Sequence, residues 1–319
     1  MRTSTTVLVI AVVSVCVSTA QALEMDWVAV GDPGNMADTR YDWCGSVACV
    51  YNIGKYEVTN NQYVEFLNAV ASSDANELYS ENMGSGYGGI TRSGSAGNYT
   101  YSAILGRGNM PVIFVSWFDT LRFANWMHNG QPTGAQDPLT TEDGAYDMSL
   151  GSTVVRKPGA QVFLPSEHQW YKAAYYKGGS TDAGYWDFAT QSDTPPTAEG
   201  PAGTDMIYGS ANHGFVVGDL TSVGAYSAKP SDSAYGTFDQ GGNVFEWNEL
   251  DFGPYRGMRG GSFYYTDLSG ISLHAVARFL GEPSMGDCHL GFRLASEVPE
   301  PATLILSTFG GLAVLRRRR

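Results

Sequence analysis

Basic residues are scarce in this chain of 319 residues, which carries 19 lysines and arginines against 32 aspartates and glutamates and a formal net charge of −13. Apart from the four arginines that end the chain, no basic cluster interrupts this acidic balance. Proteins that follow the phosphates of nucleic acids need a basic stripe or face. We therefore exclude nucleic acid as a partner.

Motifs of several enzyme classes are also absent. The five histidines show no HxxxH, HExxH or facial-triad spacing, so the sequence does not support a non-haem iron centre. No GxSxG elbow, P-loop or dinucleotide-binding fingerprint occurs. These absences argue against hydrolase, kinase and dehydrogenase functions.

Cysteine is rare as well, with four residues, of which Cys16 lies in an N-terminal segment that we expect to be removed. Cys44 and Cys49 are close enough in sequence to close a small loop in an oxidising compartment, and we predict a disulfide between them. Cys288 is then left single. We interpret it as a partly buried, small apolar residue rather than a nucleophile.

Long apolar runs occur only at the two ends. Residues 1–22 combine Arg2, an apolar run over 7–17 and a small-x-small site at 20–22, which predicts a secretory signal peptide. A transmembrane anchor is the alternative, but the run is shorter than the roughly 20 residues that span a bilayer.

The C-terminal end places Pro-Glu-Pro (299–301) before an apolar run (302–315) and four arginines. These three ordered elements resemble the PEP-CTERM sorting signal of certain Gram-negative bacteria. The resemblance implies transient membrane anchoring, removal of the tail by an export protease, and a final location at the cell surface or in the extracellular matrix. An ordinary C-terminal anchor is the alternative. We assign 297–319 to this segment and 23–296 to the folded part.

Within the folded part, three strand-to-helix steps are predicted, in "YNIGKYEVTNNQYVEFLNAV", "NMPVIFVSWFDTLRFANWMHNG" and "AQVFLPSEHQWYKAAYYKGG". Thr59, Ser116 and Ser166 stand where helix N-caps are expected. The expected buried faces follow a helical period: Tyr63, Phe66, Leu67 and Val70; Trp117, Leu121, Ala124 and Trp126; Trp170 and Ala174. After Lys177 the chain is rich in glycine, serine, aspartate and proline, which predicts long ordered loops in a single domain.

Six motifs in order carry a resemblance to a known family: "IGKYEVTNNQYVEFLN", "MPVIFVSWFDTLRFANWM", "FLPSEHQWYKAAYY", "GGNVFEW", "RGGSF" and "HLGFRLA". Together they resemble the formylglycine-generating enzyme (sulfatase-modifying factor) family. The resemblance implies an α+β fold of C-type-lectin-like topology, in a single loop-rich domain. It also implies a copper-dependent oxidase that converts a cysteine of a sulfatase to formylglycine.

The copper site of that family depends on two cysteine thiolates in the pattern GGSxxCxxxxC. This chain keeps Gly260 to Ser262 but has Tyr265 and Gly270 at the two cysteine positions. A phenol is a hard ligand with a high pKa, and glycine offers no ligand at all. Copper is therefore not expected, and we assign no catalytic residue.

Around this position the resemblance implies a substrate groove formed by Ser262, Tyr264, Tyr265 and Arg278. The tyrosines and Phe263 would supply apolar and stacking surface to a ligand. Ser262 ending a strand and Arg278 bridging loops are the structural alternatives.

The resemblance also implies two calcium sites, since hard oxygen ligands on loops suit Ca²⁺. The first comprises the carboxylates of Asp239 and Glu246 with the carbonyls of Gly242 and Val244. Loop capping and a buried salt link are the alternative roles of the two acids.

The second implied calcium site uses the side chains of Asn212 and Asp219 with the carbonyls of His213 and Thr221. Its loop is shorter than the family pattern.

Two classes of function remain. The chain is either an exported binding module for a glycan or peptide, which the missing copper cysteines favour, or a formylglycine-generating-type oxidase acting on a cysteine of a sulfatase.

Overall fold

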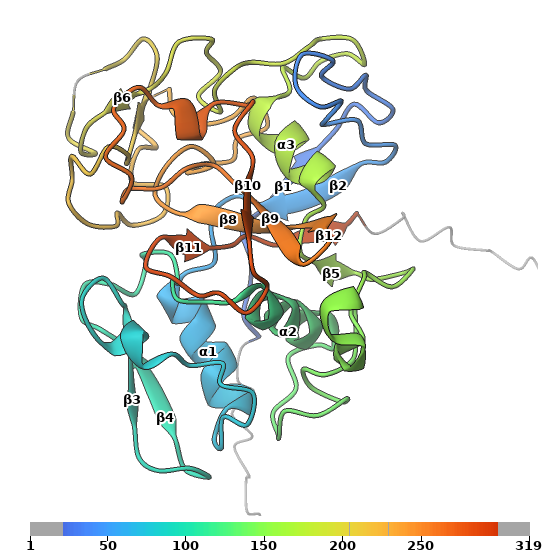
Figure 1. The fold of residues 1–319 in the computed structure, drawn as a ribbon, viewed down its shortest axis with the longest axis vertical. Helices are drawn as coiled ribbons and strands as arrows, with labels where there is room; N and C mark the ends of the chain where they lie inside the picture. Colours follow the sequence, from blue (N-terminus) through green and yellow to red (C-terminus); the bar gives the residue numbers. More distant parts are fainter. Residues whose placement is uncertain (1–21, 204, 229, 299–319) are drawn as a thin grey trace, which may run out of the picture.

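The computed structural model describes residues 22–203, 205–228 and 230–298. The predicted signal peptide and sorting segment lie almost entirely outside these residues. Two four-stranded sheets occupy the middle of the molecule, with helices α1 and α2 on one side and α3 on the other (Figure 1). No helix of the described part is long and apolar enough to cross a membrane.

The first sheet joins the two ends of the domain. Its strand order is β1 (Trp27–Val30), β2 (Tyr51–Gly54), β12 (Ala295–Glu297) and β5 (Val162–Phe163), with all neighbours antiparallel. Because β12 lies between β2 and β5, the C-terminal end of the domain closes a sheet begun by its N-terminal end.

The second sheet carries the motifs of interest. Its strand order is β10 (Phe279–Gly281), β9 (Tyr255–Arg259), β8 (Phe245–Phe252) and β11 (Leu290–Gly291). The β8–β9 pair is antiparallel with an irregularity between Trp247 and Asp251, whereas β11 runs parallel to β8. The GGN turn thus enters β8 beside the strand of the HLGF motif.

The three helices begin where the sequence predicts. They are α1 (Asn60–Val70), α2 (Trp117–His128) and α3 (Glu167–Tyr175), capped by Thr59, Ser116 and Ser166 in complete capping boxes. Every residue predicted on their apolar faces is buried. Side chains from α1, α2, β2 and β12 meet in one core, which contains the rings of Phe66, Phe123 and Phe292 in edge-on contact.

Short elements and loops complete the domain, as the composition predicts. They are the hairpin β3 (Ile90–Ser93) and β4 (Thr100–Ala103), the parallel pair β6 (Thr197–Ala198) and β7 (Ser210–Ala211), and the 3-10 helices η1 (Glu81–Gly84), η2 (Met148–Thr153) and η3 (Ile271–Leu273). The loops around β6 and β7 lie beside α3 at one end of the molecule (Figure 1).

Two local predictions are wrong. No strand forms over 110–115, where Pro111 makes only an isolated bridge to Thr59. The predicted Cys44–Cys49 disulfide is not formed either: both cysteines are free, with Cys44 buried and Cys49 exposed. The Cys44 sulfur instead accepts hydrogen bonds from Arg278 (3.2 Å) and Arg259 (3.6 Å).

Candidate functional site

The RGGSF motif turns into the interior directly after β9. Gly260 and Gly261 adopt φ values of +100° and +73°, which are readily accessible only to glycine. A Cβ at Gly261 would come within 2.8 Å of Leu273. Ser262 and Phe263 are consequently fully buried, and the Ser262 hydroxyl has no hydrogen-bond partner. Ser262 therefore lies beneath the surface rather than along an open groove.

The next two residues return to the surface. Tyr264 and Tyr265 are 45% and 40% exposed. The Tyr264 ring lies parallel to the His289 ring, with centroids 6.0 Å apart, and the Tyr265 ring meets His289 edge-on at 5.7 Å. Tyr265 also packs edge-on against Phe245 of β8 at 5.2 Å. Both rings are thus supported from below while presenting area to solvent.

A second loop extends this exposed area. The Phe215 amide donates to the Phe263 carbonyl (2.9 Å), and the Phe215 ring contacts the Tyr264 ring edge-on at 5.8 Å. Phe215 is 38% exposed and is followed by the exposed Val216. We call Phe215, Tyr264, Tyr265 and His289 the aromatic surface. Nothing in the sequence marks Phe215 as part of this surface, because only the tertiary contact brings it to Tyr264.

The two positions of the family's cysteine pair have different neighbours. Tyr265 belongs to the aromatic surface, whereas Gly270 is buried at the start of η3 with φ of +71°. A Cβ at Gly270 would come within 3.1 Å of Pro195. Neither position supplies a thiolate, so the residues present do not fit a copper ion held by two sulfurs.

Arg278 serves the alternative role of bridging loops. Its guanidinium donates to Glu167 of α3 through Nε (2.6 Å) and Nη2 (2.9 Å), and to Asp42 through Nη1 (2.9 Å). Burial raises the pKa of the Cys44 thiol beside it, and the Glu167 carboxylate adds to this effect. Arg278 thus links α3 to the loop that carries Asp42. All three of its guanidinium nitrogens already donate hydrogen bonds within the protein, so the side chain does not offer a ligand two parallel donors.

Glu246, in the first implied calcium set, is neutralised by an arginine. The Glu246 carboxylate is fully buried and accepts from Arg293 at both oxygens (2.6 Å each) and from the Trp170 indole (2.7 Å). Arg293 is also fully buried and belongs to the HLGFR motif on the chain after β11. Because a guanidinium already supplies the positive charge, this set does not fit a calcium ion.

Two further carboxyl groups lie close to this ion pair. Burial, with help from Asp239 and Glu246, raises the pKa of Glu57 well above its usual range. One Glu57 oxygen accepts from Asn243 (3.0 Å), and the other is buried without a partner. Burial also raises the pKa of Asp239 to about 6, although its carboxylate accepts from the Gly224 amide (2.6 Å). We call Glu57, Asp239, Glu246 and Arg293 the acidic network.

The second implied calcium set is more open. The Asn212 side-chain oxygen is buried and has no hydrogen-bond partner among the described residues, while its amide donates to the Asp219 carbonyl (3.0 Å). The Asp219 carboxylate is 40% exposed and accepts from both Nη atoms of Arg107 (2.8 and 2.9 Å). Asp219 is paired with an arginine, as Glu246 is, but its carboxylate is reachable from solvent. This set therefore accommodates Ca²⁺ better than the fully buried first set does.

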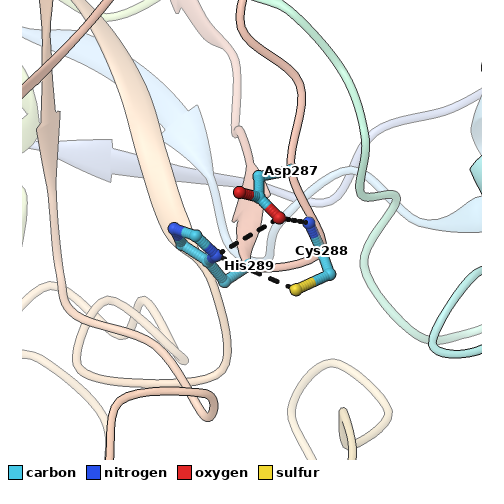
Figure 2. Close-up of side chains that lie close together, drawn as sticks. All are labelled: Asp287, Cys288 and His289. Carbon is cyan, nitrogen blue, oxygen red and sulfur yellow. Dashed lines mark hydrogen bonds and ion pairs between the residues drawn. The ribbon is translucent and has the colours of Figure 1, made fainter.

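One cluster was not predicted as a site. Asp287, Cys288 and His289 project their side chains toward one another from a single turn before β11 (Figure 2). Among the residues that the structure describes, no other group of histidine, cysteine and acidic side chains has three potential ligand atoms within 4.8 Å of one another. The consecutive letters DCH were the available signal, but Cys288 was interpreted only as a packing residue.

Comparison with known proteins identifies a family for the folded part and a sorting motif for the C-terminal segment. Residues 46–298 match the model of the sulfatase-modifying factor enzyme 1-like domain, and residues 297–319 match the PEP-CTERM protein-sorting motif. A curated murine (Mus musculus) protein named inactive C-alpha-formylglycine-generating enzyme 2 is 24% identical over 199 residues, which cover 60% of this chain. The match spans about half (51%) of that relative's length.

Solved structures support the fold. One similar structure is the crystal structure of CarF, whose sequence is 20% identical to this chain. The TM-score is 0.51, and the match covers 86% of this chain and 99% of CarF. Treponema denticola variable protein 1 is 19% identical with a TM-score of 0.52, covering 88% of this chain and 98% of that one. At these identities the likeness concerns the fold alone, which is mixed α+β, loop-rich and single-domain. The chain belongs to the sulfatase-modifying factor enzyme 1-like (formylglycine-generating enzyme) family and ends in a PEP-CTERM sorting motif.

Proposed function

We propose that this protein is an exported binding module that holds a glycan or peptide at the cell surface and does not generate formylglycine. The observation that carries the proposal is the aromatic surface, in which Tyr265 replaces the first copper cysteine and is 40% exposed. The naming of the murine relative as inactive supports the same conclusion.

The chemistry of the surface suits binding. A tyrosine offers a flat apolar ring and a hydroxyl that hydrogen-bonds, so it can stack on a sugar ring or an apolar side chain and still contact polar groups. Packing of Tyr265 on Phe245, and of Tyr264 on His289, holds the rings in place before a ligand arrives. Such pre-organisation lowers the entropy cost of binding.

The chain lacks the two cysteines that would hold copper for the oxidation of a sulfatase cysteine. In the family resemblance, two thiolates hold the copper ion that activates O₂, and here a phenol and a glycine stand at those positions. Cys44 and Cys49 do not replace the pair, because Cys44 is enclosed by Arg259 and Arg278 while Cys49 is exposed. Cys288 is a single thiol and does not supply two sulfurs.

The sorting motif supports a place of action. A PEP-CTERM motif implies processing by exosortase and sorting to the cell surface. We propose that the signal peptide at 1–22 and the part of the sorting segment after 299–301 are both removed, and that the mature domain stays on the surface or in the extracellular matrix of a Gram-negative-type bacterium. Mass spectrometry of exported protein would show a start near Leu23 and no residues after 301. An intact arginine tail on surface protein would contradict this.

We also propose a structural calcium ion at the second set. Asn212 and Asp219 would hold it, together with the carbonyls of His213 and Thr221, and it would supply only positive charge and geometry. The loop that carries these residues includes Phe215, so an ion there would order one part of the aromatic surface.

The binding proposal is tested by screening the purified protein on glycan and peptide arrays. A ligand class whose signal disappears in Tyr265→Ala supports it. Tyr255→Ala is the matched control, because Tyr255 is 41% exposed and lies on β9 outside the aromatic surface. Copper-dependent oxidation of a sulfatase-type cysteine peptide by the unmodified protein would overturn the proposal.

A further inference from the structure

The turn before β11 places three different metal-binding groups together (Figure 2), and one of them, His289, also belongs to the aromatic surface. The Cys288 sulfur lies 3.9 Å from His289 Nδ1, and His289 Nδ1 lies 3.7 Å from an Asp287 carboxylate oxygen. Each group is of a chemical type that binds metal ions directly: a thiol, an imidazole and a carboxylate.

These separations are close to those of a tetrahedral zinc site. Zn–S bonds of about 2.3 Å and Zn–N or Zn–O bonds of about 2.0–2.1 Å place neighbouring ligand atoms about 3.3–3.6 Å apart in a tetrahedron. The observed 3.9 and 3.7 Å therefore require shifts of only a few tenths of an ångström. Rotation of exposed side chains supplies such shifts, since Asp287 is 48% exposed.

The backbone of the turn is held on both sides. The Asp287 carbonyl accepts from the amides of Leu290 (3.2 Å) and Phe114 (3.0 Å), and the His289 carbonyl accepts from the Phe245 amide (2.8 Å). A ligand set on a fixed turn loses little conformational entropy when it binds an ion. The three side chains therefore converge without any rearrangement of the chain.

The side chains are oriented as well. Tyr264 stacks on the His289 ring, which fixes its plane, and Cys288 packs beside the buried Phe263 and Val244. We propose that Asp287, Cys288 and His289 bind one Zn²⁺ ion through a carboxylate oxygen, the Cys288 sulfur and His289 Nδ1. This site is separate from the copper and calcium positions of the family, and it does not depend on the proposed binding function.

The donor set favours zinc over the other ions considered for this chain. Calcium takes oxygen ligands almost exclusively, and Cu(I) prefers soft sulfur donors to a carboxylate. Zinc accepts sulfur, nitrogen and oxygen together, and sites with three protein ligands leave a fourth position for water or another ligand. That open position would lie near Tyr264 and Tyr265, whose rings contact His289.

The first experiment measures zinc alone binding to the purified protein, by calorimetry and by titration with Co²⁺, whose thiolate charge-transfer absorption reports a sulfur ligand. One equivalent should bind, and Cys288→Ser should weaken zinc binding roughly tenfold or more and abolish the cobalt band. Two matched controls should bind like the unmodified protein. Cys49→Ser removes an exposed thiol elsewhere, and His274→Ala removes a histidine that faces Asp187 at 3.6 Å without a cysteine.

A second measurement needs no variant, so it remains decisive if a substitution impairs folding. Zinc should slow alkylation of Cys288 by a thiol reagent, read by mass spectrometry of the peptide, and should leave Cys49 in the same molecule unaffected. Equal rates at Cys288 with and without zinc would overturn the proposal, as would zinc binding that is unchanged in Cys288→Ser.

Discussion

The acidic network and the aromatic surface meet at neighbouring residues of β8, since Glu246 belongs to the network and Tyr265 packs on Phe245, yet they differ in kind. In the network, Glu246 and Arg293 are fully buried and satisfy each other at 2.6 Å. On the aromatic surface, Tyr264 and Tyr265 leave nearly half of their side chains exposed. The buried ion pair is closed to a ligand, whereas the aromatic surface has accessible area that the described residues leave uncovered.

This difference indicates that the acidic network stabilises the fold, whereas the aromatic surface is available to a ligand. The GGN and HLGFR motifs meet in the network, where a residue removed from one would leave a buried charge in the other. The stretch that departs from the family pattern, around Tyr265, lies outside the network. A change there alters the surface without disturbing the ion pair, so the fold can persist although the two cysteine positions of the family pattern hold Tyr265 and Gly270.

The largest effect is expected in the network. Arg293→Met should destabilise the protein by about 3–5 kcal/mol, because it leaves the buried Glu246 carboxylate without its counter-ion. Lys157→Met is the control, since Lys157 pairs with Asp143 at the surface and such pairs contribute about 0–1 kcal/mol. Denaturant unfolding measures both. Equal effects would show that the network is not the structural centre.

The next effect is a pH dependence within the network. The pKa of Asp239 is raised from 3.8 to about 6, so the folded state holds a proton more tightly than the unfolded state does, and stability falls as pH rises from about 4 to 6. Asp239→Asn should remove this fall and stabilise the protein at pH 7. The shift corresponds to at most about 3 kcal/mol, less where solvent reaches the side chain.

Unfolding of both proteins at pH 4, 5, 6 and 7 checks this, and the curves should meet near pH 4. If Asp239→Asn instead destabilises the protein at pH 7 and removes a response to calcium, then Asp239 is a calcium ligand after all.

The third effect is a response to calcium at the loop that carries Asn212 and Asp219, beside the aromatic surface. Chelation should lower the melting temperature of the unmodified protein, by an amount that corresponds to about 2–3 kcal/mol if calcium was present near 100 times its dissociation constant. Asn212→Ala should abolish this response to chelation. Glu246→Gln should lower the stability of the protein but leave the response to chelation in place. If chelation leaves the melting temperature of the unmodified protein unchanged, the proposed calcium ion is not bound.

The smallest effect on stability is expected on the aromatic surface. Tyr265→Ala should change the free energy of unfolding by less than about 1 kcal/mol, because the ring is 40% exposed and the residue does not have a positive φ. A loss comparable to that of Arg293→Met would mean that the ring supports the fold and is not reserved for a ligand.

Local signals made the helices predictable. Thr59, Ser116 and Ser166 cap helices through contacts within three residues, which a sequence displays directly. The strand expected over 110–115 failed because a strand needs a partner along its length, and there only Pro111 forms a bridge. The fold itself followed from the order of the family motifs.

The site was harder to predict because its contacts are distant in sequence. The motif predicted Glu246 as a calcium ligand, but nothing near it in sequence indicates Arg293, which lies 47 residues later and takes both oxygens. The sequence likewise could not indicate that Ser262 turns inward or that Cys44 faces two arginines. The exposure of Tyr264 and Tyr265 agrees with the predicted surface role, which remains a proposal.

The most direct test of the central claim is the affinity of the array-identified ligand for three forms of the protein, measured by calorimetry. The account predicts that Tyr265→Ala loses roughly tenfold or more in affinity with unchanged thermal stability, as aromatic anchors of an interface commonly do. Tyr255→Ala should bind like the unmodified protein. Equal affinity of the Tyr265→Ala and Tyr255→Ala variants would contradict the claim that this family member binds its ligand where the copper cysteines of its family would lie.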